Sequence, residues 1–447
     1  MRVELFLCFI QMIVSELKFL NGEIRMIKRI FLYSLLFTSL LSVSAYAGTD
    51  DETAYALNTL LFLVSGFLVM LMAAGFCMLE SGMVTSKSVS TIAAKNIGLY
   101  SIAGLMFWVI GYNVAYGIPE GGYIGSFTPW SDASAIDTGY SDGSDWFFQM
   151  VFCATTVSIV SGTLAERIKI WPFFLFAAIL TGIIYPIEMG WQWGGGWLSA
   201  AGFSDFAGST LVHAAGGAAA LAGAIVLGPR LGRFNNGKLV PFASSSIPLA
   251  TLGTFILWFG WFGFNGGSQL ALAGFENATA VATIYINTNL AACAGVMTCA
   301  VITRLVNGKT DVIMMLNGAL GGLVAITAEP LTPTPLMAII IGSIGGIIVI
   351  VGTEVLTRFK IDDVVGAIPV HLFAGIWGTL AVPLTNSGTS FGAQLLGTAS
   401  ICAFVFVVSF IIWSIMKSTV GIRISEEAEK EGTDIAETGV TAYAIRD

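Results

Sequence analysis

The stretch TPLMAIIIGSIGGIIVIVGTEVLT, residues 334–357, decides the fold class of this chain. It carries one charged residue, Glu354, over a length that exceeds the roughly 20 apolar residues an α-helix needs to cross a bilayer. Similar segments recur along the sequence, of which 55% is hydrophobic and only 11% charged. They lack the alternation of the roughly 10-residue strands of a membrane barrel. The sequence therefore predicts an all-α polytopic membrane protein rather than a soluble globular domain.

Eleven such segments follow residue 50, separated by short polar breaks. They lie at residues 54–79, 90–116, 145–165, 171–190, 208–230, 247–270, 278–304, 311–328, 334–357, 368–388 and 392–417. We predict eleven transmembrane helices in one membrane domain, residues 48–417, followed by a cytoplasmic tail, residues 418–447.

The segment MIKRIFLYSLLFTSLLSVSAYA, residues 26–47, has the features of a cleavable signal peptide. A basic start and an apolar run lead to a small-x-small ending at Ala47. We expect this segment to be removed, and the alternative is an uncleaved twelfth helix. Residues 1–25 resemble neither a domain nor a signal, so Met26 is a candidate start codon and residues 1–25 a candidate extension of the gene model.

The charged residues test the orientation that signal removal implies, with the mature N-terminus outside. With eleven helices, the basic residues after residue 50 all fall inside: Lys87, Lys95, Arg167, Lys169, Arg230, Arg233, Lys238, Arg304, Lys309, Arg358, Lys360, Lys417, Arg423, Lys430 and Arg446. The outer loops carry acids, such as Asp132, Asp137, Asp142 and Asp145. This sorting follows the positive-inside rule. It predicts an outer N-terminus, an inner C-terminus and a place in the cytoplasmic (inner) membrane.

The sequence carries no sign of enzyme or metal chemistry. The six cysteines show no CxxC spacing and fall mostly inside apolar segments, which favours buried thiols over disulfides or metal ligands. We find no nucleotide loop, metal-ligand spacing or nucleophile motif. The net charge is −8, and the basic and acidic residues are separated to the two sides of the membrane rather than gathered in one patch. We therefore predict no enzyme activity, no cofactor, no metal and no nucleic-acid partner.

The only two histidines, His213 and His371, occupy corresponding segments, the fifth and the tenth. Segments one to five and six to ten would form an inverted 5+5 repeat, with a final helix added. Each histidine follows an aspartate, Asp205 or Asp363, by eight residues. In inverted repeats the substrate site lies at the repeat interface near the membrane midplane. The two imidazoles would meet there, and the aspartates could instead serve as helix N-caps.

A single histidine in an apolar helix is more often a packing residue than a functional one. Two symmetry-related histidines favour function, because an ionisable group at membrane depth is costly unless it faces a cavity or a partner. An imidazole donates through one nitrogen and accepts through the other, so a facing pair can relay a proton. We interpret His213 and His371 as the centre of a conduction path.

Aromatic side chains gather toward the outer ends of three segments. They are Phe148 and Phe152, Trp193, and Trp261 and Phe264, with Ser268 on the same stripe as the last two. An interfacial belt of aromatic residues is one interpretation. The other is a cation vestibule, because ring faces attract cations by about 2 kcal/mol or more where water is excluded.

Seven stretches carry a recognisable pattern. They are GFCMLESGMV (75–84), FQMVF (148–152), LAERI (164–168), WGGGWL (193–198), DFAGSTLVH (205–213), GWFGFNGGS (260–268) and VGIRISEEAEKEG (420–432). In this order, over about residues 54–440, they resemble the ammonium transporter family, of which the Rhesus glycoproteins are distant relatives.

The resemblance implies a set of site residues. They are Phe148, Phe152, Trp193 and Ser268 for recruitment of ammonium, Phe152 and Phe264 for a phenyl gate, His213 and His371 for the pore and a proton relay, Asp205 for deprotonation and helix architecture, and Trp261 for the pore lining. The implied function is ammonium uptake for nitrogen assimilation. NH4+ would be recruited outside and deprotonated, and NH3 conducted like a solute in a channel. The resemblance also implies a homotrimer and a PII signal protein at the inner face.

The pattern departs from the family at Gly366, Pro369 and Leu372, around the second histidine. We expect Pro369 to kink its helix, because proline removes a backbone donor. Two other functions stay open. A sensor of ammonium would carry a fused signalling domain, for which the residues after Lys417 are few. Another ion channel or secondary transporter would need a charged or carbonyl-lined filter, and no ring of acids lies within the predicted helices.

Overall fold

The computed structural model describes residues 11, 33, 50–235 and 238–443. The predicted signal segment and N-terminal extension lie, apart from two positions, outside the described residues. The chain divides into two units, Met1–Thr53 and Ala54–Asp447. The helices and strands described below belong to the second unit. Their first helix, α3, begins at Asp51, just before that unit starts.

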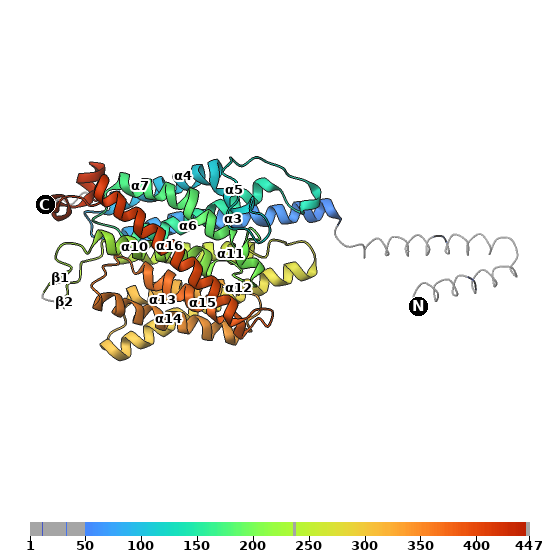
Figure 1. Ribbon diagram of the computed structural model, residues 1–447. Coiled ribbons are helices and arrows are strands. Elements are labelled where there is room, and N and C mark those ends of the chain that lie inside the picture. The colour runs from blue at the N-terminus through green and yellow to red at the C-terminus, as the bar shows by residue number, and fades with distance from the viewer. Residues whose placement is uncertain (1–10, 12–32, 34–49, 236–237, 444–447) are drawn as a thin grey trace. The chain divides into compact units, whose positions relative to one another are not determined.

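Long helices make up nearly all of the second unit (Figure 1). Uninterrupted ones are α3 (Asp51–Met83), α6 (Asp142–Thr163), α11 (Ile247–Gly267), α12 (Phe275–Asn307), α13 (Val312–Thr327), α14 (Pro335–Arg358) and α16 (Phe391–Thr419). Four others contain a wider π-helical turn, which is η2, η4, η5 or η6. They are α4–η2–α5 (Val89–Met106, Phe107–Gly111, Tyr112–Tyr116), α7–η4–α8 (Ile170–Ile179, Leu180–Ile184, Tyr185–Gly190), η5–α10 (Ser209–Ala214, Ala215–Leu227) and η6–α15–η7 (Ile368–Phe373, Ala374–Ala381, Val382–Leu384), in which η7 is a 3-10 turn. Short elements complete the unit: η3 (Ile136–Thr138), α9 (Trp197–Ala200), the hairpin β1 (Phe234–Asn235) and β2 (Lys238–Leu239), α17 (Glu426–Glu431) and η8 (Asp434–Thr438).

Nine helices in the described part of the chain are long and apolar enough to cross a membrane. They coincide with nine of the eleven predicted segments, so the chain is a multi-pass membrane protein. The remaining two segments form apolar but shorter helices, Val312–Thr327 and Ile368–Leu384. Because these fall below the roughly 20 residues of a full crossing, the count of eleven stays a prediction.

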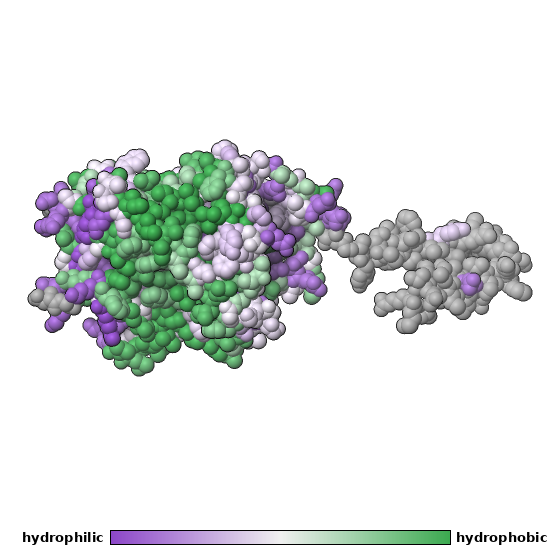
Figure 2. Space-filling view, viewed as in Figure 1, coloured by the Kyte–Doolittle hydropathy of each residue, from purple (hydrophilic) through white to green (hydrophobic). Residues whose placement is uncertain are grey.

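The surface of the second unit matches a lipid environment. Figure 2 shows apolar residues over the middle of the face in view and polar residues toward its two ends. Large apolar side chains stand exposed there and elsewhere, among them Phe67, Phe259 and Leu305. So much exposed apolar area would be an aggregation hazard in water. Lipid tails are the solvent that suits it.

Small residues set the crossing of α3 and α11. A Cβ on Gly75 would stand 2.9 Å from the Leu257 side chain, and one on Gly253 would stand 2.2 Å from the Leu79 backbone nitrogen. Glycines let helices approach closely in lipid, where no hydrophobic effect drives them together. Inside this framework, α6 and the η5–α10 helix are almost entirely buried and form the core of the unit.

Candidate functional site

The two histidines lie face to face in the buried core. Nδ1 of His213 is 3.2 Å from Nδ1 of His371, and the ring centroids are 5.2 Å apart with an interplanar angle of 24°. The residues belong to η5 and η6, elements 158 positions apart in the sequence. At this distance one nitrogen must donate and the other accept, so a neutral pair holds one proton between the rings.

Asp205 holds the histidine segment η5. Its carboxylate accepts four backbone N–H groups, from Gly208, Ser209, Thr210 and Leu211, at 2.7 to 2.9 Å. These are donors that a helix start leaves without intrahelical partners. Burial raises the pKa of the Asp205 carboxyl, and the four amide donors act in the opposite direction. Asp205 is therefore a buried helix cap, and it lines neither of the cavities described below.

Asp363 holds the second histidine segment, η6, in the same way. It accepts the backbone N–H of Gly366 at 3.1 Å and that of Ile368 at 2.7 Å, with the Thr163 hydroxyl at 3.1 Å. Gly366 has φ of +79°, and Gly208, the third residue after Asp205, has φ of +105°. Only glycine adopts such angles without a steric penalty. The departure from the family pattern at Gly366 thus has a backbone reason.

Pro369 does not set its segment apart. It is the second residue of η6, a position where the missing N–H would have no intrahelical partner. The η5 segment, which contains no proline, forms the same wide turn. The wide turn is therefore a feature of both histidine segments rather than an effect of Pro369.

Two glycines let the histidine segments cross. A Cβ on Gly217 would stand 2.6 Å from the backbone nitrogen of Leu372, and one on Gly375 would stand 2.3 Å from the Ser209 carbonyl oxygen. Each glycine lies twelve residues after the capping aspartate of its own segment. Backbone contact at these two points sets the separation of the imidazoles.

Stacked rings lie on one side of His213. Phe152 stacks on Phe264 with centroids 3.9 Å apart. Phe264 and Trp261 both stack against the His213 ring, at 5.2 and 4.9 Å. The Trp261 indole N–H donates to the Thr327 hydroxyl at 2.8 Å, which fixes its plane. The predicted gate and pore-lining residues therefore meet at the histidine pair.

A cavity of about 260 Å³ opens beyond Phe152. It is lined by Tyr112, Tyr116, Tyr140, Asp145, Phe148, Gln149, Phe152, Trp193, Phe206, Ser268 and Leu270. We call it the aromatic cavity and its side of the unit the aromatic end. All four predicted recruitment residues lie here, and the lining contains one carboxylate and no basic side chain. Ring faces and a carboxylate suit a cation.

Hydrogen bonds orient two of these side chains. The Ser268 hydroxyl donates to the Phe264 carbonyl at 2.8 Å, which leaves its oxygen lone pairs to accept from a ligand. The Trp193 indole N–H donates to the Asp205 carbonyl oxygen at 2.9 Å. Trp193 meets Phe152 edge to face, with centroids 5.9 Å apart.

Asp145 is a cavity residue that sequence reasoning assigned to the outer loops. It lies in the first turn of α6 and accepts the Tyr112 hydroxyl at 2.5 Å and the Gln149 amide at 3.4 Å. It precedes Phe148 by three residues and Phe152 by seven, a spacing that places all three on one helix face. That spacing would have identified it.

On the far side of the histidine pair a much smaller cavity, of about 10 Å³, adjoins His371. Its lining includes Phe76 and Glu80 of α3, Ile159 of α6 and Val370 of η6. The Phe76 ring centroid is 6.1 Å from that of His371. We call this the inner cavity.

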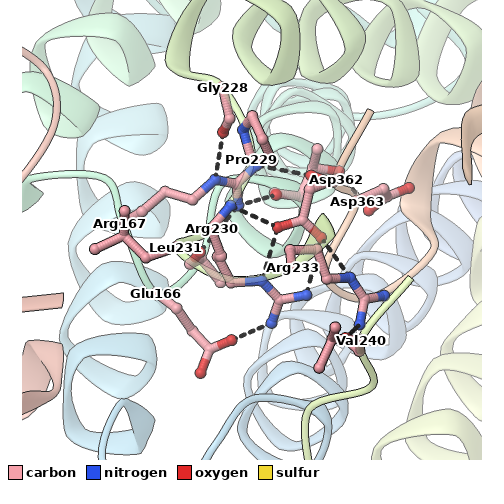
Figure 3. Close-up of polar contacts among 12 residues, drawn as sticks. Glu166, Arg167, Gly228, Pro229, Arg230, Leu231, Arg233, Val240, Asp362 and Asp363 are labelled. Atoms are coloured by element: carbon pink, nitrogen blue, oxygen red, sulfur yellow. Dashed lines mark hydrogen bonds and ion pairs between the residues drawn. The ribbon is translucent and has the colours of Figure 1, made fainter. Parts of the chain in front are cut away.

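Beyond the inner cavity lies an ionic cluster, at what we call the charged end. Figure 3 shows Arg230 between Glu166 and Asp362, with which it forms ion pairs. Arg233 approaches Asp362 at 3.2 Å, and Arg167 donates to the Asp362 carbonyl at 2.7 Å. Burial raises the pKa of the Asp362 carboxyl, but hydrogen bonds from Arg230 and the nearby guanidinium charges bring it well below its usual range.

The C-terminal tail packs onto the charged end. Asp434 accepts the backbone N–H groups of Val89 and Thr91, at 3.1 and 2.8 Å, at the start of α4. Glu437 accepts the N–H of Ile170, the first residue of α7, at 2.7 Å. Tail carboxylates therefore cap two helices, in a segment whose acidic composition alone would favour a solvated chain.

Comparisons with known proteins place the chain among relatives of one kind. The model of the Ammonium Transporter Family matches residues 60–443. Ammonium transporter Amt2 of Archaeoglobus fulgidus is 41% identical over 420 residues, which cover 85% of this chain and 87% of the relative. A solved Sensor Amt Protein superposes with a TM-score of 0.82 at 34% identity, covering 87% of this chain and all of that one. Mep2 of Candida albicans superposes with a TM-score of 0.77 at 25% identity, covering 88% and 94%.

These matches agree with the apolar helices and with the motifs that carry the site. The family is one of transporters and not of enzymes. This chain is a multi-pass membrane protein that belongs to the ammonium transporter family.

Proposed function

We propose that this protein takes up ammonium across the cytoplasmic membrane, recruiting NH4+ at the aromatic end and conducting NH3 past the histidine pair. One observation carries the proposal: the aromatic cavity, the Phe152–Phe264 stack and the His213–His371 pair follow one another without a basic side chain in the cavity lining. A cation can approach through such a lining, and the stacked rings oppose the passage of a hydrated ion.

Recruitment rests on Phe148, Phe152, Trp193 and Ser268. The ring faces attract the cation, and the Ser268 oxygen accepts one of its N–H groups. Asp145 adds a negative charge to the same cavity. Water leaves as the ion reaches the rings, so direct contacts with these side chains replace its hydration.

Deprotonation follows from the dryness of the path. Burial disfavours the charged form of an amine, and it lowers the pKa of a fully buried lysine by up to about 3–5 units. The same desolvation should lower the pKa of ammonium in a dry pore. NH4+ gives its proton to the protein or to water before the Phe264 ring, and NH3 crosses. Asp205 contributes through its fixed charge and through the cap that positions His213. The proton passes separately along the two imidazoles, which makes transport electrogenic.

The sidedness and symmetry of the path belong to the same proposal. The basic residues after residue 50 fall at the charged end by the eleven-helix count, so we assign that end to the cytoplasm. The matched aspartates, positive-φ glycines and crossing glycines of η5 and η6 support an inverted repeat. The family resemblance extends the proposal to a homotrimer with a PII protein at the charged end.

Electrical recording on proteoliposomes tests the relay. Ammonium pulses should evoke currents with the wild-type protein and none with the double variant His213→Ala/His371→Ala. Cys293→Ala, which changes an exposed side chain on α12, is the control and should keep the wild-type current. Undiminished currents in the double variant would sink the relay.

A second substitution tests recruitment. Ser268→Leu removes the acceptor and fills part of the aromatic cavity, so the half-saturating ammonium concentration should rise several-fold. An unchanged half-saturating concentration would show that the recruitment site has been misplaced.

A sensor function is the alternative, because a Sensor Amt Protein is a close structural neighbour. A sensor would bind ammonium without sustained flux. Flux of isotope-labelled ammonium into proteoliposomes, measured beside binding, separates the two functions.

A further inference from the structure

Glu80 is a buried carboxylate that the conduction mechanism above does not use. It lies near the end of α3 and is 1% exposed. Oε2 accepts the Ser161 hydroxyl at 2.8 Å and the Asn96 amide at 3.4 Å. Oε1 is buried and has no hydrogen-bond partner among the described residues. Buried polar atoms nearly always have a partner, so an oxygen without one points to a missing donor.

The inner cavity supplies the space for that donor. Glu80 and His371 both line it. Its volume of about 10 Å³ is close to the smallest that accepts one water-sized molecule. An ammonium ion is about that size. Gly162 keeps the space open, because a Cβ there would stand 3.2 Å from Cγ of Glu80 and 2.5 Å from the Val365 side chain.

The nearest buried cation does not occupy the position. Lys95 donates from Nζ to the Ser161 carbonyl at 2.8 Å and stands 5.1 Å above the Phe173 ring. Within the described part of the chain, Glu80 has no ion pair closer than 4 Å. Lys95 balances the charge of Glu80 through Ser161 and leaves Oε1 free for a ligand.

We propose that Glu80 and His371 form an ammonium-binding position in the inner cavity, on the opposite side of the histidine pair from the aromatic cavity. This inference rests on the proposed function, because it concerns the fate of NH3 after the pore. Glu80 would be the first carboxylate that the molecule meets after leaving His371.

The chemical step at this position is a proton transfer. The lone pair of NH3 takes the proton from a ring nitrogen of the protonated histidine pair. The N–H bond of the imidazolium breaks, the imidazole becomes neutral, and NH4+ forms. Oε1 of Glu80 accepts one N–H of the new cation in a charge-assisted hydrogen bond. The proton released on the aromatic side is thereby returned to the same substrate.

Sided measurements of affinity test the position. The protein is inserted in one orientation in a planar bilayer, and ammonium is added to one chamber at a time. Glu80→Gln keeps the shape of the side chain and removes its charge. For ammonium added at the charged end, we expect a roughly tenfold rise in the half-saturating concentration, which is about 1.4 kcal/mol. For ammonium added at the aromatic end, it should stay within about twofold.

Glu188→Gln is the matched control. Glu188 is another fully buried glutamate within a membrane helix, and both of its carboxylate oxygens have no partner among the described residues. It lines neither the aromatic nor the inner cavity, so its variant should match the wild type from both sides. An equal change from both sides in Glu80→Gln, or no change from either, would overturn the proposal.

Two further arms keep the result interpretable. If Glu80→Gln fails to fold because Lys95 loses its balancing charge, Glu80→Gln/Lys95→Met restores neutrality and should show the same one-sided loss. A two-sided loss in that variant counts against the proposal. A wild-type protein that gives no ammonium current from either side would refute the proposed function itself, whereas normal wild-type currents with an unaltered Glu80→Gln refute only the inner site.

Discussion

The aromatic end and the charged end differ in how their charged side chains are paired. At the aromatic end a cavity of about 260 Å³ is lined by rings and one carboxylate. At the charged end, guanidinium and carboxylate groups pair with one another, and the inner cavity next to His371 has a volume of only about 10 Å³. The carboxylate at the first end faces a cavity, whereas those at the second end are paired with guanidinium groups.

A buried charge stabilises a fold chiefly where it is paired, and the two ends differ in that respect. Arg230 is surrounded by its partners, whereas Asp145 faces an open cavity and bonds only neutral groups. Substitutions at the charged end should therefore change stability, and those at the aromatic end should change affinity. Equal effects on stability and on affinity from substitutions at the two ends would contradict this division.

Arg230→Ala should have the largest effect on folding. It leaves Glu166 and Asp362 buried without their main counter-charge, which typically costs about 3–5 kcal/mol. Unfolding by denaturant in detergent measures the change. Arg358→Ala is the control, because Arg358 pairs with Glu354 on an exposed helix face and such pairs contribute almost nothing. Equal losses in the two variants would contradict the division.

Acid should weaken the charged end next. The pKa of Asp362 is lower in the folded protein than the value of about 3.9 that aspartate has in an unfolded chain. Its stabilising contribution is therefore complete above about pH 4 and is lost as the pH falls further. Thermal unfolding at pH 7, 5 and 3 should show a drop only at the lowest pH. Arg230→Ala should flatten that drop, and a drop of equal size in the variant would count against Asp362 as its source.

Asp434→Ala should have a smaller effect, about 1–2 kcal/mol, because it removes one helix cap. Limited proteolysis of the tail, together with thermal unfolding, measures the loss of docking. Glu431→Ala removes the same charge from an exposed position on the same segment and should leave both unchanged. If both variants release the tail equally, net charge rather than capping holds it.

Asp145→Asn should have the smallest effect, and on affinity rather than folding. Loss of one charge across a solvated cavity costs about 1 kcal/mol, so the half-saturating ammonium concentration should rise about fivefold. Asp137→Asn alters an exposed acid outside the cavity and is the control. A marked loss of stability without a loss of affinity would show that Asp145 stabilises the fold rather than binding ammonium.

Much of the fold was predictable because lipid imposes simple rules on sequence. Segments of about 20 apolar residues marked nine of the helices directly, and the pairing of His213 with His371 followed from their equal spacing to aspartates. The short helices were harder, since glycine and proline blur their ends. The wide turns η5 and η6 carry no composition signal, and they depend on caps that become visible only in three dimensions.

The site was predictable where several residues share one helix face. Phe148, Phe152 and the Trp261–Phe264 stripe could be grouped by spacing alone. Glu80 could not, because its environment is assembled from α3, α4, α6 and η6, which are distant in sequence. The docking of the tail was equally hidden, since it depends on backbone N–H groups, which every residue except proline carries.

The crossing of Gly217 over Leu372 and of Gly375 over Ser209 has a consequence for how such chains can diverge. A larger residue at Gly217 would push the partner segment, and with it the imidazole of His371, out of register. A larger side chain at either crossing should then be tolerated only if the residue that it meets on the other helix becomes smaller. In related chains, residue volumes at positions 217 and 372 would vary together and in opposite directions, which makes the pair a record of how the two histidine segments have stayed in contact.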